Sequence, residues 1–177
     1  MNEELILVDI YDNEIGTASK AAAHSQPLLH RAFSIFLYDD REKSARLLMQ
    51  KRALSKYHSP GLWANTCCSH PRLGEDLFDN AARRLMEELR ISSPPPLLEI
   101  DAFVYYHQFH TDLYEYEFDH VLVGRYSGSY QVNPAEAAEA CWVAEDILAK
   151  DLLDNPKVYA PWFLIAAPLV LQWLKRQ

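Results

Sequence analysis

Cysteine is scarce in this chain, and its scarcity excludes a fold held together by disulfides. Three cysteines occur in 177 residues, and two of them, Cys67 and Cys68, are adjacent. Adjacent cysteines rarely pair with each other, because a disulfide needs Cα atoms that lie further apart. Three cysteines provide no framework of the kind that small secreted domains use, so we expect a reducing, cytoplasmic location.

The chain also lacks basic runs and long apolar runs. Its formal net charge is −8 and its Lys and Arg residues form no long run, which argues against a nucleic acid or an anionic membrane as the main partner. The most apolar segment, from Trp162 to Leu174, is about thirteen residues long, whereas a membrane span needs roughly twenty. The acidic start, Met1 to Glu4, does not resemble a signal peptide. A small phosphorylated substrate remains compatible with this composition, because it needs only a few well-placed cations.

Composition and apolar patterning predict one α+β domain over residues 1–177. Hydrophobic content of 49% and charged content of 24% are ordinary for a soluble globular domain. The segment from Lys20 to His30 is expected to be a loop or a short helical turn broken by Pro27. Runs of β-favouring residues predict strands at Leu5–Ile10, Ala32–Tyr38, Arg46–Lys51, Phe103–Phe109 and Tyr114–Tyr126.

Two helices are expected beside these strands. The clearer one runs from about Glu75 to Arg90, with an apolar face at helical spacing and a stop at the prolines after Ser93. The other begins at Pro161 and should kink at Pro168. We therefore predict a mixed or antiparallel sheet flanked by helices.

One predicted strand alternates acidic and aromatic residues. Glu115 and Glu117 alternate with Tyr114, Tyr116 and Phe118. Because successive side chains of a strand point to opposite faces, both carboxylates share one face and the aromatic rings share the other. With His24, His30 and His70, which lie in predicted loops or strand edges, the two glutamates would form a three-nitrogen, two-oxygen ligand set. Such a set suits Zn, Mn or Fe, although sequence spacing alone leaves open whether the five residues converge.

The remaining histidines have no comparable support in the sequence. We interpret them as structural or surface residues: His58, His107, His110 and His120.

The central helix carries a second pattern, Glu75 followed by Arg83-Arg84-Leu85-Met86-Glu87-Glu88. This pattern resembles the Nudix box, a loop and helix that hold divalent metals on diphosphates. Arg84 replaces the first Glu of the catalytic trio, and Arg90 replaces the final Gly. A cation at Arg84 lowers the negative charge that a metal-dependent hydrolase needs and offers a phosphate contact instead. Taken alone, the helix is also compatible with a solvated amphipathic helix whose Arg and Glu residues pair four positions apart.

Several further motifs, in order along the chain, resemble type I isopentenyl-diphosphate Δ-isomerase, a Nudix-fold family. The resemblance extends from about Leu5 to Trp162. The motifs are Leu29-His30-Arg31-Ala32-Phe33-Ser34, Arg52-Ala53-Leu54-Ser55-Lys56, Asn65-Thr66-Cys67-Cys68-Ser69-His70-Pro71, Tyr114-Glu115-Tyr116-Glu117 and Ala160-Pro161-Trp162.

The resemblance implies an isomerase that moves a double bond between isopentenyl and dimethylallyl diphosphate through a tertiary carbocation. Cys68 would act on one side of the substrate, and Glu117, assisted by Tyr105, on the other. The first metal site would take one Mn²⁺ or Zn²⁺ on His24, His30, His70, Glu115 and Glu117. Glu88 would hold Mg²⁺ against the diphosphate. The substrate-binding residues implied are Lys20, Arg52, Lys56, Ser69, Arg84 and Trp162.

Two other functions remain open from the sequence. A metal-dependent Nudix diphosphate hydrolase is the main alternative, although Arg84 disfavours it and it assigns no role to Cys68 or Glu117. A non-catalytic module that only binds a diphosphate is the third. In each case we expect a small-molecule ligand, no nucleic acid, no membrane, and a monomer or weak dimer.

Overall fold

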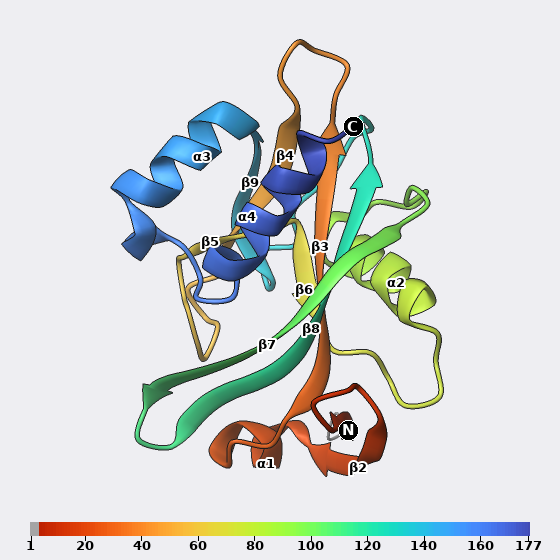
Figure 1. Ribbon diagram of the computed structural model, residues 1–177, viewed down its shortest axis with the longest axis vertical. Coiled ribbons are helices and arrows are strands. Elements are labelled where there is room, and N and C mark those ends of the chain that lie inside the picture. The colour runs from red at the N-terminus through yellow and green to blue at the C-terminus, as the bar shows by residue number, and fades with distance from the viewer. Residues whose placement is uncertain (1–3) are drawn as a thin grey trace.

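β3 (His30–Asp39) is the strand around which the sheet is built in the computed structural model, which describes residues 4–177. It pairs in parallel with β8 (Leu113–Arg125) and antiparallel with β1 (Glu4–Val8), β4 (Arg46–Arg52) and β6 (Cys67–Ser69). Residues 1–3, with most of the acidic start, lie outside the described part. The sheet is therefore mixed, as predicted (Figure 1).

The remaining elements complete the sheet and its helical layers. They are β2 (Glu14–Ser19), α1 (Lys20–Ser25), β5 (Trp63–Ala64), α2 (Leu77–Leu89), β7 (Leu98–His110), β9 (Ala137–Ala144), α3 (Glu145–Asp154), the 3₁₀ turn η1 (Pro156–Val158) and α4 (Phe163–Leu174). Within residues 4–177, no helix has both the length and the apolar character that crossing a membrane requires.

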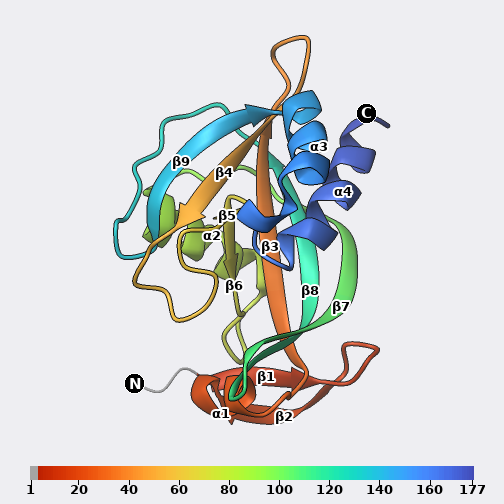
Figure 2. The same ribbon diagram turned by 90° about the vertical axis from the view of Figure 1, so that its left-hand side faces the viewer.

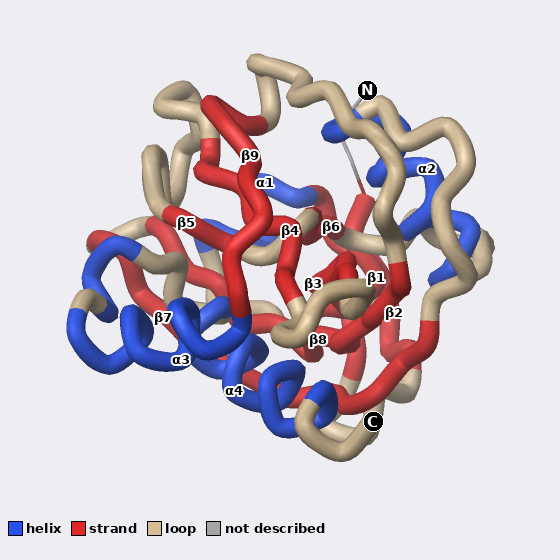
Figure 3. The backbone as a smooth tube through the Cα atoms, turned by 90° about the horizontal axis from the view of Figure 1, so that it is seen from above, coloured by secondary structure: helices blue, strands red, loops and turns tan. Residues whose placement is uncertain are grey.

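The strands bury side chains on both faces of the sheet. On β3, Phe36 belongs to the core under α4, whereas Ile35 and Leu37 belong to the core under α2. This is the period of two that a strand imposes, and it produces two cores because both faces are covered. The end-on view shows α3 and α4 on one side of the strands and α2 on the other (Figure 3), and α3 lies beside α4 (Figure 2).

α2 confirms the helix predicted over the Nudix-like pattern, with boundaries set by its caps. Asp76 is the N-cap and accepts hydrogen bonds from the backbone N–H groups of Phe78 and Asp79. Arg90 is the C-cap and has a left-handed backbone with φ of 55°. Glycine is the usual residue in that conformation, so an arginine here keeps the ordinary cap geometry at some steric cost.

Four elements between residues 98 and 174 differ from the predictions. β7 begins five residues earlier than expected, at Leu98. The sequence analysis missed β9 and α3 altogether; α3 has no side-chain N-cap and buries Leu148 alone, so it lacks both the cap and the apolar face by which helices are recognised. α4 confirms the terminal helix but begins at Phe163, and Pro168 lies within it.

The N-terminal half also differs at its short elements. β1 ends at Val8 because Asp9 turns the chain, accepting from the backbone N–H groups of Tyr11 and Asn13. The segment after Lys20 forms the short helix α1, which was one of its two predicted forms. The strands β2, β5 and β6 are too short or too exposed to be recognised from their sequence.

Candidate functional site

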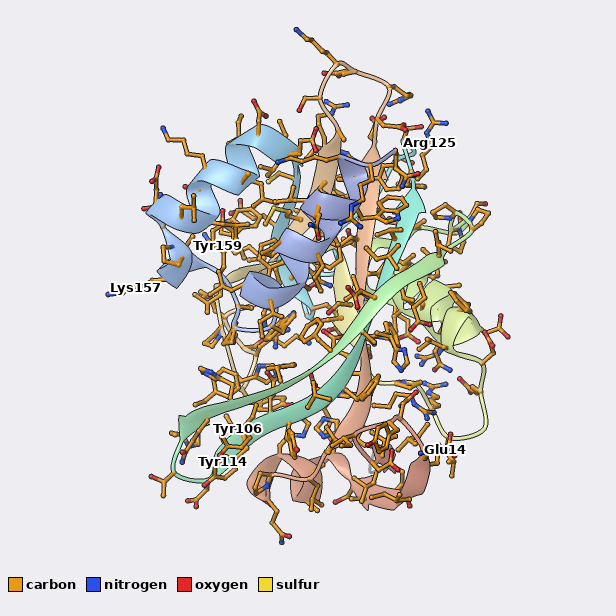
Figure 4. All side chains as sticks on the ribbon, in the orientation of Figure 1. Glu14, Tyr106, Tyr114, Arg125, Lys157 and Tyr159 are labelled. Atoms are coloured by element: carbon orange, nitrogen blue, oxygen red, sulfur yellow. The ribbon has the colours of Figure 1, made fainter. Side chains whose placement is uncertain are left out.

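The inward face of β8 is acidic and buried, which reverses the usual arrangement of a strand. Glu115, Glu117 and Asp119 are buried, whereas Tyr114 and Tyr116, on the alternate positions, are only partly buried. Tyr106 lies on the same outer face, with its ring centroid 6.1 Å from that of Tyr114 (Figure 4). The predicted alternation of carboxylates and aromatic rings is therefore present. Burying three carboxyl groups is costly unless they are paired or bind a cation, so this face indicates a functional site.

Three histidines from separate segments meet Glu117. His24 comes from α1, His30 from the first position of β3, and His70 follows β6. One ligand atom of each residue lies within 4.8 Å of those of the others. The pairing of β3 with β8 places His30 directly opposite Glu117.

The ring orientations of the histidines suit a metal ion. His24 Nδ1 lies 2.8 Å from the carbonyl of Lys20, and His30 Nδ1 lies 2.8 Å from the carbonyl of Leu28. These contacts assign the N–H to Nδ1 and leave the Nε2 lone pairs free, which is the arrangement of metal-ligating histidines. Within the described residues, both Nε2 atoms are buried without a hydrogen-bond partner. The donor set, neutral imidazoles with a carboxylate, therefore fits a divalent metal.

Glu115 lies beside this cluster and not within it. Its Oε2 accepts from the hydroxyl of Tyr105 at 2.7 Å, and its Oε1 lies 3.1 Å from His58 Nε2. The structure thus brings together four of the five predicted ligands, and it joins the fifth to them through Tyr105.

Tyr105 links the two glutamates through one hydroxyl. The hydroxyl oxygen lies 2.7 Å from Glu115 Oε2 and 2.6 Å from Glu117 Oε2. Burial, reinforced by the charge of Glu117, raises the pKa of Glu115 well above its ordinary value. Burial also acts to raise the pKa of Glu117, but the neighbouring His30 and His70 outweigh it and hold that pKa well below the ordinary value. The pKa values of the two carboxyl groups are therefore displaced in opposite directions, with Tyr105 between them.

Cys68 faces the cleft, while Cys67 faces the core under α2. The two are consecutive on β6, so they point to opposite sides of the sheet. Burial raises the pKa of Cys68 to about 12, so its side chain is a neutral thiol at neutral pH. Cys67, Cys68 and Cys141 are all free.

Trp162 lies at the wall of the same cleft and is fixed by a buried partner. Its indole Nε1 donates to Asn65 Oδ1 at 3.0 Å. The guanidinium of Arg52 lies 5.1 Å from the centroid of the indole ring, and Arg52 Nη1 lies 3.9 Å from the sulfur of Cys68. The ring face beside Cys68 therefore already carries a cation, which is the chemistry that an indole face favours.

The cationic end of the cleft lies along α2 and the loop after β4. The Nη2 atom of Arg84 donates to Glu88 at 2.5 Å, and its Nη1 atom donates to Glu87 at 2.6 Å. Gln50 Nε2 donates to the other oxygen of Glu88 at 3.0 Å. One cleft is lined by the predicted residues Lys20, Arg52, Lys56, Cys68, Ser69, His70, Arg84, Glu88, Glu115, Glu117 and Trp162. Tyr105, His24 and His30 lie behind its wall.

His58, Glu136 and Asp119 are among the cleft residues that the sequence analysis missed. His58 was interpreted as structural or surface, but it is buried and lines the cleft. Glu136 forms ion pairs with Lys56 and Arg84. Asp119 accepts from the hydroxyl of Ser34 at 2.8 Å, and burial raises its pKa well above the ordinary value. Asp119 continues the alternation of Glu115 and Glu117, so that signal was present in the sequence; His58 and Glu136 gave none.

Comparison with known proteins links this cleft to one fold and one activity. The model of the NUDIX domain family matches residues 28–163. The isopentenyl-diphosphate Delta-isomerase of Serratia proteamaculans is 48% identical over 164 residues, 93% of this chain and 89% of that protein. The isopentenyl-diphosphate Delta-isomerase of Burkholderia multivorans is 44% identical over 99% of this chain and 100% of its own length.

Solved structures of low sequence identity share the fold. DR0079 from Deinococcus radiodurans has a TM-score of 0.74 at 19% identity, covering 94% of this chain and 98% of its own. The NUDIX domain of Shewanella oneidensis NrtR, complexed with ADP ribose, has a TM-score of 0.63 at 17% identity, covering 82% and 87%.

Proposed function

This chain belongs to the isopentenyl-diphosphate Delta-isomerases within the NUDIX family, and we propose how its residues carry out that reaction. The reaction interconverts isopentenyl and dimethylallyl diphosphate by adding a proton to the alkene and removing another from the resulting tertiary carbocation. It requires one acid and one base on opposite sides of a small hydrocarbon, with water excluded from the cation. The observation that carries the proposal is that Cys68 and Glu117 line one cleft whose other end is cationic.

Cys68 and the Glu117–Tyr105 pair are the two proton-handling groups. Glu117 and Tyr105 are buried and Cys68 is half-buried. Cys68 meets the cleft from β6 and Glu117 from β8. In the forward direction one group protonates the terminal carbon of the alkene, which leaves the positive charge on the tertiary carbon. The other group removes a proton from the carbon between that centre and the diphosphate-bearing carbon, and the electrons of the broken C–H bond form the new double bond. Tyr105 connects Glu117 to Glu115, so a proton can be shared along three oxygen-bearing side chains.

We assign to Trp162 the stabilisation of the carbocation. Its indole is among the residues that line the cleft with Cys68, and Arg52 shows that a cation can lie over the ring. A cation over a desolvated indole is stabilised by about 2 kcal/mol or more. The indole does this without reacting as a nucleophile at the cation centre, which suits a carbocation intermediate.

We assign binding of the substrate's diphosphate to five residues of the cleft: Lys20, Arg52, Lys56, Ser69 and Arg84. Arginine and lysine neutralise phosphate oxygens, and Arg84 presents two donors in a fixed fork. Its position at the first glutamate of the Nudix trio favours isomerase over hydrolase chemistry, because it pairs with Glu87 and Glu88 and leaves fewer free carboxylates for a water-activating metal.

Divalent metals are assigned to two places. The residues that would hold Mn²⁺ or Zn²⁺ are His24, His30, His70, Glu117 and Glu115, and Glu88 would hold Mg²⁺ beside the diphosphate. When bound, these ions fix the charge of the carboxylates and neutralise the diphosphate. We also propose a cytoplasmic location. We propose that the protein is a monomer or weak dimer, and sedimentation of the purified protein would test this oligomeric state.

The reaction itself is tested by NMR in D₂O. Purified protein with isopentenyl diphosphate and Mg²⁺ should form dimethylallyl diphosphate that carries solvent deuterium in a methyl group. Unchanged substrate with metal-loaded protein would overturn the isomerase. Release of phosphate or pyrophosphate would instead indicate the diphosphate hydrolase, and unchanged behaviour of a Cys68→Ala variant would indicate a binding module.

A further inference from the structure

His58 lies at the junction between the metal-site glutamates and the diphosphate-binding arginine. It is 8% exposed, and aromatic rings enclose it. The ring centroids of Tyr57, Phe109 and Trp162 lie 4.5, 5.2 and 5.7 Å from its own. A ring packed in this way has little freedom to rotate, so its nitrogen atoms are held in fixed directions.

The side chain of His58 is directed at Glu115. Its Nε2 lies 3.1 Å from Glu115 Oε1, while the other oxygen of that carboxyl group accepts from Tyr105 at 2.7 Å. Both oxygens of Glu115 are therefore engaged, one by His58 and one by Tyr105. Because Tyr105 also contacts Glu117, the orientation of Glu115 is coupled to that of the second glutamate.

The main-chain carbonyl of His58 accepts hydrogen bonds from Arg52, separately from the contact that its ring makes with Glu115. The carbonyl oxygen of His58 accepts from Arg52 Nε at 3.4 Å and from Nη2 at 3.2 Å. Arg52 Nη2 also lies 3.3 Å from His58 Nε2. A single ring nitrogen cannot bond to the carboxyl group and accept from the guanidinium at once. The contact with Glu115, at 3.1 Å, is the shorter of the two and has a carboxyl oxygen as acceptor, so the ring nitrogen donates to Glu115.

We propose that His58 is a positioning residue of the His/Glu metal site, which orients Glu115 as a ligand. The inference rests on the metal assignment of the proposed function. Ligating carboxylates are held by hydrogen bonds from outside the ligand set, and loss of such a partner typically lowers metal affinity about 10–100-fold. Without His58, Glu115 Oε1 faces a cavity lined by aromatic rings, and the carboxyl group is free to turn away from the cluster.

The test is a Mn²⁺ titration of metal-free protein, with free Mn²⁺ followed by electron paramagnetic resonance and no diphosphate present. The variants are His58→Ala, which removes the hydrogen bond to Glu115, and His58→Gln, whose amide N–H can replace that hydrogen bond. His110→Ala is the matched control, because His110 is an exposed histidine at the end of β7. We expect His58→Ala to bind Mn²⁺ about 10–100-fold more weakly, with His58→Gln and His110→Ala close to wild type.

Two results would overturn the inference, and they are distinguishable from each other. If His58→Ala binds Mn²⁺ as tightly as wild type, the metal site stands and the role of His58 is wrong. If wild type itself binds no Mn²⁺, the metal assignment fails and the inference fails with it. Should His58→Ala not fold, as judged by circular dichroism, His58→Gln decides alone: near-native affinity supports a replaceable hydrogen bond, and affinity lowered tenfold or more contradicts it.

Discussion

The hydroxyl of Tyr105 lies 2.6 Å from Glu117 Oε2, and the same hydroxyl lies 2.7 Å from Glu115 Oε2. A tyrosine has one hydroxyl proton, so it can donate to only one of the two carboxyl groups at a time. The second contact requires a proton on a glutamate. The three residues therefore form a short chain that can move a proton to or from the cleft.

Tyr105→Phe should impair turnover through this chain. Acid–base groups contribute roughly 10²–10⁴-fold to rates, so we expect kcat to fall about 100-fold with little change in KM. The buried carboxyl groups also lose a donor, which should cost about 1–3 kcal/mol of unfolding free energy. Steady-state kinetics and urea unfolding measure the two effects. Tyr106→Phe is the control, because Tyr106 is the next residue but lies on the outer face, 53% exposed; a kcat for Tyr105→Phe within twofold of that control would contradict the proton chain.

Cys68→Ala should abolish turnover while substrate binding is retained. We expect kcat to fall by about 10³-fold or more, since one of the two proton-handling groups is lost.

Because burial raises the pKa of Cys68 to about 12, its sulfur should react slowly with iodoacetamide at pH 7, as the thiolate is the reactive form. Mass spectrometry follows the alkylation, and Cys141→Ala serves as the cysteine control. Rapid alkylation of Cys68 at pH 7 would show that the thiol is ionised in the free enzyme.

Arg84→Lys should weaken diphosphate binding although the charge is kept. The guanidinium contacts Glu87 and Glu88 at once, and a lysine offers only a compact point charge. We expect KM for isopentenyl diphosphate to rise about tenfold, with a smaller change in kcat, which corresponds to about 1.4 kcal/mol of lost binding. The matched variant Arg83→Lys alters the neighbouring arginine, which pairs with Glu87 but does not line the cleft. Equal KM values for the two variants would argue against a substrate contact at Arg84.

Arg90→Gly should stabilise the protein. Arg90 has φ of 55° at the C-cap of α2, and a residue with a Cβ atom in the left-handed region costs roughly 1–2 kcal/mol relative to glycine. We expect a gain of about 1 kcal/mol in the urea unfolding free energy, with kcat and KM unchanged. Arg90→Ala removes the same side chain but keeps the Cβ atom. If it stabilises the protein equally, the gain does not come from the backbone.

Asp39 should make stability fall in acid. Hydrogen bonds from Arg41 lower the pKa of Asp39, whereas burial acts to raise it. A hydrogen bond from Arg46 adds to the lowering, so the pKa lies well below its ordinary value of 3.8. A carboxylate with a lowered folded-state pKa contributes stability above the unfolded pKa, and that contribution is lost as the pH falls below about 4. Asp39→Asn should be less stable than wild type at pH 7 by about 1–2 kcal/mol. The difference should shrink as the pH falls from about 4 to 2 in urea unfolding, and a constant difference across this range would contradict the assignment.

Local patterns were sufficient for the elements that carry their own signals. α2 has a capping aspartate, an apolar face and a proline stop, so its position followed from neighbouring residues. The alternation around Glu115 and Glu117 likewise predicted which side chains share a face of β8. The motif around Cys68 indicated the family, which the relatives confirm. The missed elements, α3 among them, have weak caps or few buried residues, and tertiary contacts stabilise them.

The sequence by itself determined which residue types were available for the chemistry: a thiol, paired carboxylates, histidines and a helix that carries adjacent arginines. Only the tertiary structure decided that they meet. The parallel pairing of β3 with β8 sets His30 opposite Glu117, and the pairing of β6 with β3 sets Cys68 opposite Ser34. These pairings join segments far apart in the chain, and their register depends on side chains packed on both faces of the sheet. For the same reason His58 and Glu136, which have no local signal, became visible as site residues only once the sheet was formed.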